Sequence, residues 1–421
     1  LDARGAPWRL GLAGLLLASS AGAAPVPPAP KPDRIEPGLF PGLAYDSNLG
    51  VGFGVVGNLA RFRPGCTPWC WKATAQVFLY LDRGPDGAPE VTYTHNYLDL
   101  DLPGQLDGRL RLQIRGWFRR QVDSGWYGLG NASPASKPWE AFAEGSEAYA
   151  RARRYHEYDR IEPAGRFVAR FALGAGLEAF AGFLGSYNRV QPYAGSLLEA
   201  DLTRPDGDPT RDALVGAGEH GVLQGLAGLL FDSRDDEVDP ERGMFHELSV
   251  RGGGVLGEET GYGGLNLHLR GFLPVVPAHL VLALRVQGDL LWGGAPFYEL
   301  GRTGGLWPDD GPAGPIAVRG IPTRRYHGPA KAFGNVELRA RFFTVRVFGQ
   351  DATLGAVAFV EAGRVWAALK KLPELDGEGL GLHGGAGGGL RLRFGTTFVV
   401  RVDAAWSPDG VGVYADVNHV F

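Results

Sequence analysis

Residue types that carry out chemistry in enzymes are present in this sequence, but their spacing fits no catalytic or metal-binding pattern. His156 and His246 are each followed by Glu, yet neither has a second His four residues on, as a zinc peptidase helix requires. There is no Gly-x-Ser-x-Gly nucleophile motif and no phosphate-binding loop. Acidic residues are dense over 232–241, but they lack the ligand spacing of an EF-hand. We therefore expect no enzymatic activity, no cofactor and no metal site.

Two cysteines, Cys66 and Cys70, lie in the segment FRPGCTPWCW. In an oxidising compartment they can pair across a tight turn. The alternative is a pair of unbridged thiols in a loop. No second Cys or His pair lies nearby to complete a tetrahedral zinc site. We predict a disulfide between the two residues.

The N-terminal segment has the pattern of an export signal. Arg4 and Arg9 precede an apolar core at 10–18, and an A-x-A site predicts cleavage after Ala23, so residues 1–23 are the expected signal peptide. Residues 24–38 are rich in proline and are the expected periplasmic linker. No later run of about 18 apolar residues predicts a membrane-spanning helix. The formal charge of −4, with scattered arginines, argues against a nucleic-acid partner.

Apolar and polar residues alternate in long segments over most of the chain. In 279–290, leucine and valine occupy one face, while His, Arg, Gln and Asp occupy the other. Residues 411–421 alternate in the same way and finish on Phe421. Such segments run to ten residues or more, matching the roughly 9–11 residues of a tilted membrane strand. Charges in the middle of the polar face fit a wet lumen. We predict an all-β fold over 39–421, a transmembrane antiparallel β-barrel.

The alternation predicts about sixteen strands, an even number as in bacterial single-chain barrels. Their expected ranges are 40–46, 50–62, 71–82, 90–101, 108–121, 151–171, 177–190, 218–231, 243–254, 262–272, 278–292, 333–347, 354–366, 384–394, 397–406 and 411–421. With a periplasmic N-terminus, the long connections 122–150, 191–217, 293–332 and 367–383 all become extracellular. Long connections on the extracellular side and short turns on the periplasmic side are typical of outer-membrane barrels.

Several short motifs occur in order along these strands and loops. They are Y-G-L-G-N at 127–131, F-D-S-R-D at 231–235, V-R-G-I at 318–321, N-V-E-L-R at 335–339, F-V-E-A-G at 359–363 and R-V-D at 401–403. Together they resemble the motifs of the BamA/TamA-like bacterial surface antigen family of outer-membrane β-barrels. The resemblance extends from about Phe40 to Phe421, so it covers the whole predicted barrel. It also identifies the acidic run at 232–241 as a periplasmic turn.

In this family a long extracellular loop folds into the lumen, where its arginine meets acidic residues on inner strand faces. The resemblance implies that Arg319 meets Glu337 and Glu361 and that Gly320 allows a tight turn. We name these four residues the loop latch. The alternative is an ordinary exposed loop arginine. Two departures from the family pattern are Ile321, in place of an aromatic residue, and the glutamate at 361, in place of aspartate.

The resemblance implies a role in outer-membrane biogenesis, by insertion or translocation of proteins or lipids. Family members carry periplasmic POTRA domains ahead of the barrel, and residues 24–38 are too few for one, so we expect a form without them. The implied partners are outer-membrane lipid, a POTRA-bearing subunit or a lipoprotein, and the barrel assembly machinery that inserts this chain. Phe421 resembles the signal read by that machinery; alternatively, it only packs at the lipid interface.

The competing interpretation is a passive outer-membrane pore or structural barrel. In a pore, the arginines on the polar strand faces would set ion selectivity. These residues are Arg111, Arg115, Arg285, Arg339 and Arg401. A loop folded into the lumen would obstruct such a pore, which favours the biogenesis role.

Overall fold

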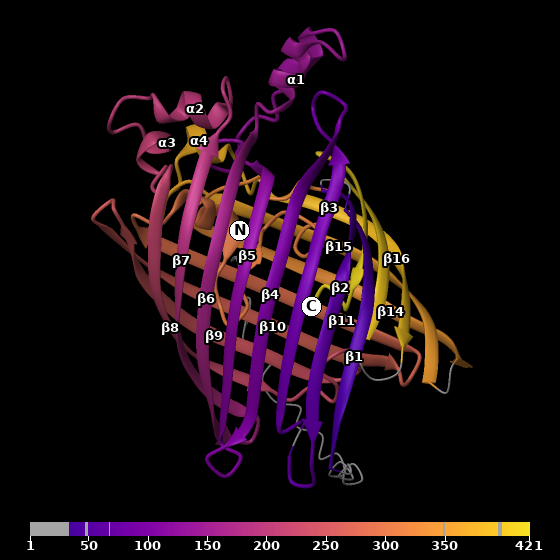
Figure 1. The fold of residues 1–421 in the computed structure, drawn as a ribbon. Helices are drawn as coiled ribbons and strands as arrows, with labels where there is room; N and C mark the ends of the chain where they lie inside the picture. The colour runs from indigo at the N-terminus through magenta and orange to yellow at the C-terminus, as the bar shows by residue number, and fades with distance from the viewer. Residues whose placement is uncertain (1–32, 47–48, 67, 348–349, 395–397) are drawn as a thin grey trace, which may run out of the picture.

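The computed structural model describes residues 33–46, 49–66, 68–347, 350–394 and 398–421. Within them, sixteen strands form a closed barrel in which every neighbouring pair is antiparallel (Figure 1). The barrel strands are β1 (Arg34–Asp46), β2 (Gly50–Phe62), β3 (Trp71–Arg83), β4 (Pro89–Gln105), β5 (Leu110–Gly125), β6 (Glu157–Gly174), β7 (Leu177–Pro192), β8 (Glu219–Asp232), β9 (Gly243–Leu256), β10 (Thr260–Val276), β11 (Leu280–Gly293), β14 (Ala330–Val347), β15 (Gln350–Trp366), β16 (His383–Phe394), β17 (Phe398–Ser407) and β18 (Gly410–Val417). The predicted class and strand count are confirmed.

The two faces of the strands differ as a membrane barrel requires. On β11, Val286 points outward and is 57% exposed, whereas the adjacent Arg285 points inward and is 2% exposed. On β14, Leu338 is exposed and Glu337 is fully buried. The outer surface is therefore an apolar band suited to lipid, and the interior holds the charges.

Helices of the described residues are short, and none has the length and apolar character needed to cross a bilayer. They lie in the long connections, which gather at one end of the barrel (Figure 1). These elements are η1 (Pro138–Ala141), α1 (Glu147–Arg153), α2 (Leu197–Leu202), α3 (Pro209–Asp212), η2 (Phe297–Gly301) and α4 (Pro373–Asp376). A two-stranded ladder, β12 (Arg302–Thr303) with β13 (Asp309–Asp310), lies in the connection between β11 and β14.

The connections at this end pack on a shared apolar cluster. Trp126 is fully buried there, contacts the Phe297 ring edge-on and donates from its indole nitrogen to Asp201, 2.9 Å away. Tyr158 and Leu198 are buried in the same cluster. Segments from several connections thus cover the helix-bearing mouth of the barrel.

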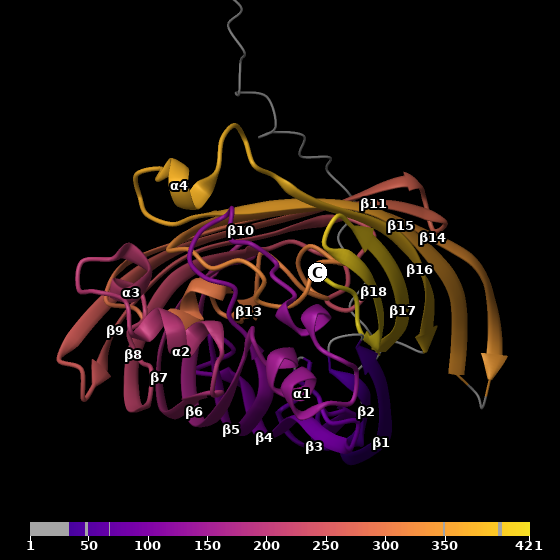
Figure 2. The ribbon, with the colours of Figure 1, turned by 90° about the horizontal axis from the view of Figure 1, so that it is seen from above.

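The connection 294–329 lies within the ring of strands (Figure 2). Arg324 donates to Gln121 of β5, and the amide nitrogen of Leu306 donates to Glu247 of β9. Arg319 contacts Asp403 of β17. A segment that touches strands so far apart around the ring occupies the lumen; we name residues 294–329 the lumenal loop.

The two largest boundary errors lie at the start of strands. β1 begins at Arg34, so residues 34–38 of the predicted linker pair with β2 instead. β6 begins at Glu157 rather than 151, because Glu147–Arg153 forms α1, whose first turn is capped by the Ser146 hydroxyl. The predicted signal peptide, residues 1–23, lies outside the described residues.

The end of the chain also differs from the prediction. β18 stops at Val417, and Asn418 takes a left-handed backbone conformation with φ of 67°. Val420 and Phe421 then lie buried against Phe272 of β10 and Val281 of β11. Packing of Phe421 at the lipid interface, the alternative given above, requires an outward ring, but the turn at Asn418 directs the ring inward. A lipid-interface position for this ring was therefore wrong.

Candidate functional site: the lumenal loop and the barrel seam

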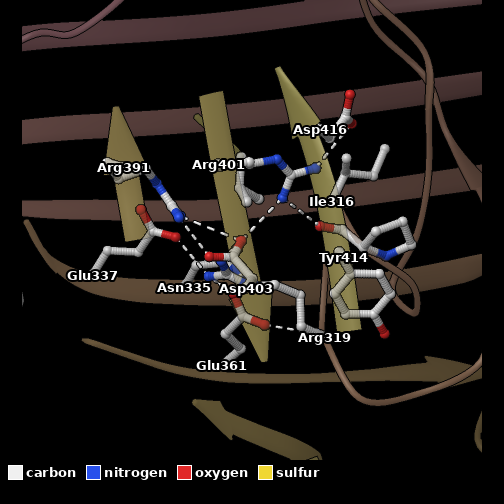
Figure 3. A network of polar contacts seen from close by, with 12 residues as sticks. Ile316, Arg319, Asn335, Glu337, Glu361, Arg391, Arg401, Asp403, Tyr414 and Asp416 are labelled. Carbon is white, nitrogen blue, oxygen red and sulfur yellow. Dashed lines mark hydrogen bonds and ion pairs between the residues drawn. The ribbon is translucent and has the colours of Figure 1, made fainter. Parts of the chain in front are cut away.

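Arg319 is the centre of a buried ionic network that joins the lumenal loop to three barrel strands (Figure 3). Its Nη2 lies 2.5 Å from Oε1 of Glu337 on β14 and 2.5 Å from Oε1 of Glu361 on β15. Its Nη1 lies 2.8 Å from Oδ2 of Asp403 on β17. All four side chains are fully buried. The guanidinium therefore contacts carboxylates from three different strands at once, and charge-assisted bonds of this kind are the strong ones.

Of the three carboxylates, Glu361 accepts the most hydrogen bonds from Arg319. Its Oε1 accepts from Nε of Arg319 at 2.9 Å and from the Asn335 amide at 2.7 Å, and its Oε2 accepts from the backbone nitrogen of Arg319 at 2.6 Å. The Asn335 amide also donates to the carbonyl of Ala317 at 2.6 Å. Glu361 and Asn335 thus fix the loop backbone as well as the arginine.

Asp403 was not among the residues predicted for the latch. It accepts from Arg391 and Arg401 in addition to Arg319. A signal for it exists, because Asp403 and Arg401 share the polar face of β17 and lie in one of the family motifs.

Burial alone lowers the pKa of Arg319, but Glu361, Glu337 and Asp403 more than offset that effect and hold the pKa above its ordinary value. Arg319 is thus a permanent cation in this network.

Close approach of the loop to the wall depends on two glycines. Gly320 has φ of +88°, and its backbone nitrogen donates to the Tyr414 hydroxyl of β18 at 3.1 Å. A side chain at Gly385 of β16 would place its Cβ 2.2 Å from the carbonyl oxygen of Arg319. Neither position tolerates a side chain without displacing the loop.

Apolar contacts support the ionic network. Val318 and Ile321 are buried beside Tyr326, Phe333 and Val365. The smaller Ile321 therefore sits in a filled apolar pocket where the family carries an aromatic residue. The guanidinium of Arg319 also lies over the Phe359 ring, 3.4 Å from its centre, in a cation–π contact.

Cys66 and Cys70 form a disulfide in the connection between β2 and β3, with Cα atoms 5.0 Å apart.

The acidic run at 232–241 makes ion pairs in the turn between β8 and β9. Asp236 pairs with Arg393, and Asp239 pairs with Arg341. Among the described residues, no group of three or more His, Cys, Asp or Glu side chains is placed to hold a metal ion.

Phe421 lies between two lumenal arginines. The guanidinium groups of Arg285 and Arg339 are each 4.9 Å from the centre of its ring, and Arg339 donates to its main-chain oxygen at 2.9 Å. In the same C-terminal segment, His419 contacts Asp239 of the β8–β9 turn at 2.9 Å. The role of Phe421 as an assembly signal stays a prediction.

The ladder between the first and last strands is short. β1 pairs with β2 along its whole length, but within the described residues it pairs with β18 only at Tyr45↔Ala415 and Asp46↔Tyr414. The inward turn after Val417 carries the chain away from β1, so no strand of the described residues pairs with the β1 edge from Arg34 to Ala44 on this side. Leu39 and Leu43 on this stretch are 73% and 82% exposed. We name this junction the seam.

Comparisons with known proteins agree with the barrel fold. Residues 223–415 match the Omp85 superfamily domain. BamA from Haemophilus ducreyi, solved without POTRA domains 1–3, aligns with a TM-score of 0.53 at 14% identity, over 91% of this chain and 70% of that one. CdiB from Escherichia coli aligns with a TM-score of 0.52 at 12% identity, over 94% of this chain and 63% of that one. No curated protein matches the sequence significantly.

The family match covers the strands that carry Glu337, Glu361 and Asp403 and includes the loop that carries Arg319. The two solved barrels share the fold over nearly the whole chain. The resemblance inferred from the sequence motifs is therefore confirmed: residues 223–415 of this chain match the Omp85 superfamily domain, and the chain shares the barrel fold of BamA.

Proposed function

We propose that this barrel acts in biogenesis of the bacterial outer membrane, inserting or translocating proteins or lipids at the seam. The observation that carries the proposal is the two-pair ladder between β1 and β18. An unpaired strand edge presents free N–H and C=O groups and is a template for pairing with another strand. Within the described part of the chain that edge extends from Arg34 to Ala44, and its outward leucines, Leu39 and Leu43, would meet the lipid.

The lumenal loop supports the same role over the passive pore. Its contacts with β5, β9 and β17 support a loop that crosses the interior through which ions would have to pass. The alternative, an outer-membrane pore, draws support only from the arginines of the lumen. A lumen crossed by a loop that is fixed through Arg319 is poorly suited to free passage of solutes.

In this proposal the latch holds the lumenal loop in place while the free edge at the seam pairs with a strand of the protein that is being inserted, which we call the client. Outer-membrane lipid surrounds the barrel, and a POTRA-bearing subunit or a lipoprotein would deliver the client. The BamA that shares this fold is itself a protein with POTRA domains. The barrel assembly machinery would insert this chain, with Phe421 as part of the signal that it reads.

An insertion assay in liposomes tests the proposal. An unfolded outer-membrane protein is added to liposomes that contain the purified barrel, and its folding is followed by heat-modifiability on gels. We expect folding to be about tenfold faster than in empty liposomes, because a strand template lowers the barrier to strand pairing by about 1.4 kcal/mol or more. Equal rates in the two kinds of liposome would contradict the proposal.

A further inference from the structure

A second feature of the lumen is a cavity of about 340 Å³ between the barrel wall and the lumenal loop. Its lining is unusually rich in arginine. The arginines are Arg115, Arg119, Arg160, Arg166, Arg251 and Arg302. The carboxylates that also line it are Glu162, Glu299, Asp309 and Asp310. Six arginines and four carboxylates thus line one cavity.

Arginines on β5 and β6 lie directly opposite one another in this wall. Arg115 pairs in register with Arg166, and Arg111 pairs in register with Arg170. Like charges at opposed positions of an antiparallel ladder are destabilising unless other groups neutralise them. This arrangement therefore calls for counter-charges on neighbouring strands or in the cavity.

Three of these four arginines have a carboxylate partner on an adjacent strand. Arg111 and Arg115 bind Asp101 and Asp99 of β4, and Arg170 binds Glu178 of β7. Among the described residues, Arg166 contacts no carboxylate; its Nη2 donates to the carbonyl oxygen of Leu306 in the lumenal loop. Arg166 is therefore a cation at the cavity wall without a counter-ion in contact.

Nearby carboxylates already have other partners. Glu162 binds both Arg119 and Arg160, and Glu247 accepts from Ser249 and from the amide nitrogen of Leu306. Asp310 binds Arg302 and Arg324, and Glu299 binds Arg302. Within the described part of the chain, none of these four groups has a contact with Arg166 in addition.

Two further arginines of the lining, each with a side chain more than nine-tenths buried, have N–H groups without an acceptor in the described residues, as does the more exposed Arg302 at its Nε. The atoms of the first two are Nη1 of Arg160 and Nε of Arg251, on side chains that are 3% and 5% exposed. Buried donors are almost always hydrogen-bonded in native proteins, because an unpaired one is costly. Both lie at the wall of the cavity that Arg166 also lines.

We propose that this cavity binds a small multivalent oxyanion of the phosphate class. Guanidinium groups bind phosphate oxygens through planar, charge-assisted hydrogen bonds. Such an anion neutralises Arg166 and supplies acceptors for Arg160 and Arg251. The volume accommodates a phosphate with a small organic group attached.

Titration of the purified barrel with inorganic phosphate tests this site, with calorimetry as the readout and chloride at equal ionic strength as the reference. We expect saturable binding to the wild-type barrel. Arg166→Gln should weaken it about tenfold or more, the loss expected for one charge-assisted bond. The variant leaves no carboxylate unpaired, so folding should be preserved; Arg166→Lys keeps the charge and should lose less affinity.

Arg270→Gln is the matched control. Arg270 of β10 is also a lumenal arginine without a carboxylate in contact in the described residues, but it does not line the cavity. Unchanged phosphate affinity in this variant supports the site. An equal loss in both variants, or no saturable binding to the wild-type barrel, overturns the proposal.

A competition experiment in nanodiscs distinguishes a lipid headgroup from a soluble anion as the source of the phosphate. If phosphatidic acid in the bilayer competes with inorganic phosphate, the site takes a lipid headgroup; without competition, it takes a soluble anion. Either outcome supports a phosphate site, provided that Arg166→Gln weakens phosphate binding about tenfold or more.

Discussion

Replacing Arg319 with alanine is expected to lower the free energy of unfolding of the barrel by about 3–5 kcal/mol, the cost of leaving a buried charge without its partner. The effect should concentrate on Glu361. Glu337 retains Arg339, and Asp403 retains Arg391 and Arg401, whereas among the described residues Glu361 keeps only two neutral donors, the Asn335 amide and the backbone N–H of residue 319. Urea unfolding of the purified barrel, together with its heat-modifiability, measures the change.

Two variants make this prediction specific. Arg120→Ala removes an ion pair with Asp159 in which the Arg120 side chain is 49% exposed, so it should cost less than about 1 kcal/mol. Adding Glu361→Gln to Arg319→Ala should recover much of the loss, because the amide carries no charge to be buried. Unchanged stability of Arg319→Ala, or no recovery in the double variant, would show that the network does not hold the loop.

Locking the seam with a disulfide is expected to reduce insertion activity in liposomes about tenfold or more, to near the rate of empty liposomes, if clients enter between β1 and β18. The change is Tyr45→Cys with Ala415→Cys, in a background where Cys66 and Cys70 are serine. These two residues are register partners, and directly opposed residues of antiparallel strands have Cα atoms about 4.5–5.5 Å apart, within reach of a disulfide. Reduction of the disulfide should restore activity.

The control places the same crosslink where the wall is continuously paired. Val55 of β2 and Val77 of β3 are register partners and both face outward. Val55→Cys with Val77→Cys should therefore leave the insertion rate unchanged, oxidised or reduced. A seam-locked barrel as active as this control would place client entry elsewhere.

Most of the fold was predictable because one physical rule governs it. A strand between lipid and a wet lumen must alternate, so β2, β9 and β11 were located to within two or three residues at each end. The errors lie where other forces act. Ser146 caps a short helix ahead of β6, and the left-handed conformation of Asn418 ends β18 early. The alternation of apolar and polar residues does not indicate either feature.

The family motifs predicted the loop latch. Alternation could not predict it, because alternation shows which strand face carries Glu337 and Glu361 but not which loop crosses the lumen to contact them. Even so, Asp403 was missed, because its partner Arg319 lies 84 residues away in sequence. The inward course of Phe421 was missed for a similar reason. Its contacts with Phe272, Arg285 and Arg339 come from strands distant in the chain.

The conductance of single wild-type barrels in a planar bilayer tests the central claim most directly. A lumen crossed by a loop fixed at Arg319 predicts no large, steady single-channel steps, and Arg319→Ala should produce larger, fluctuating currents as the loop is released. Large and steady steps from the wild-type barrel, in a preparation without insertion activity, would contradict a seam-based role and identify the protein as a pore.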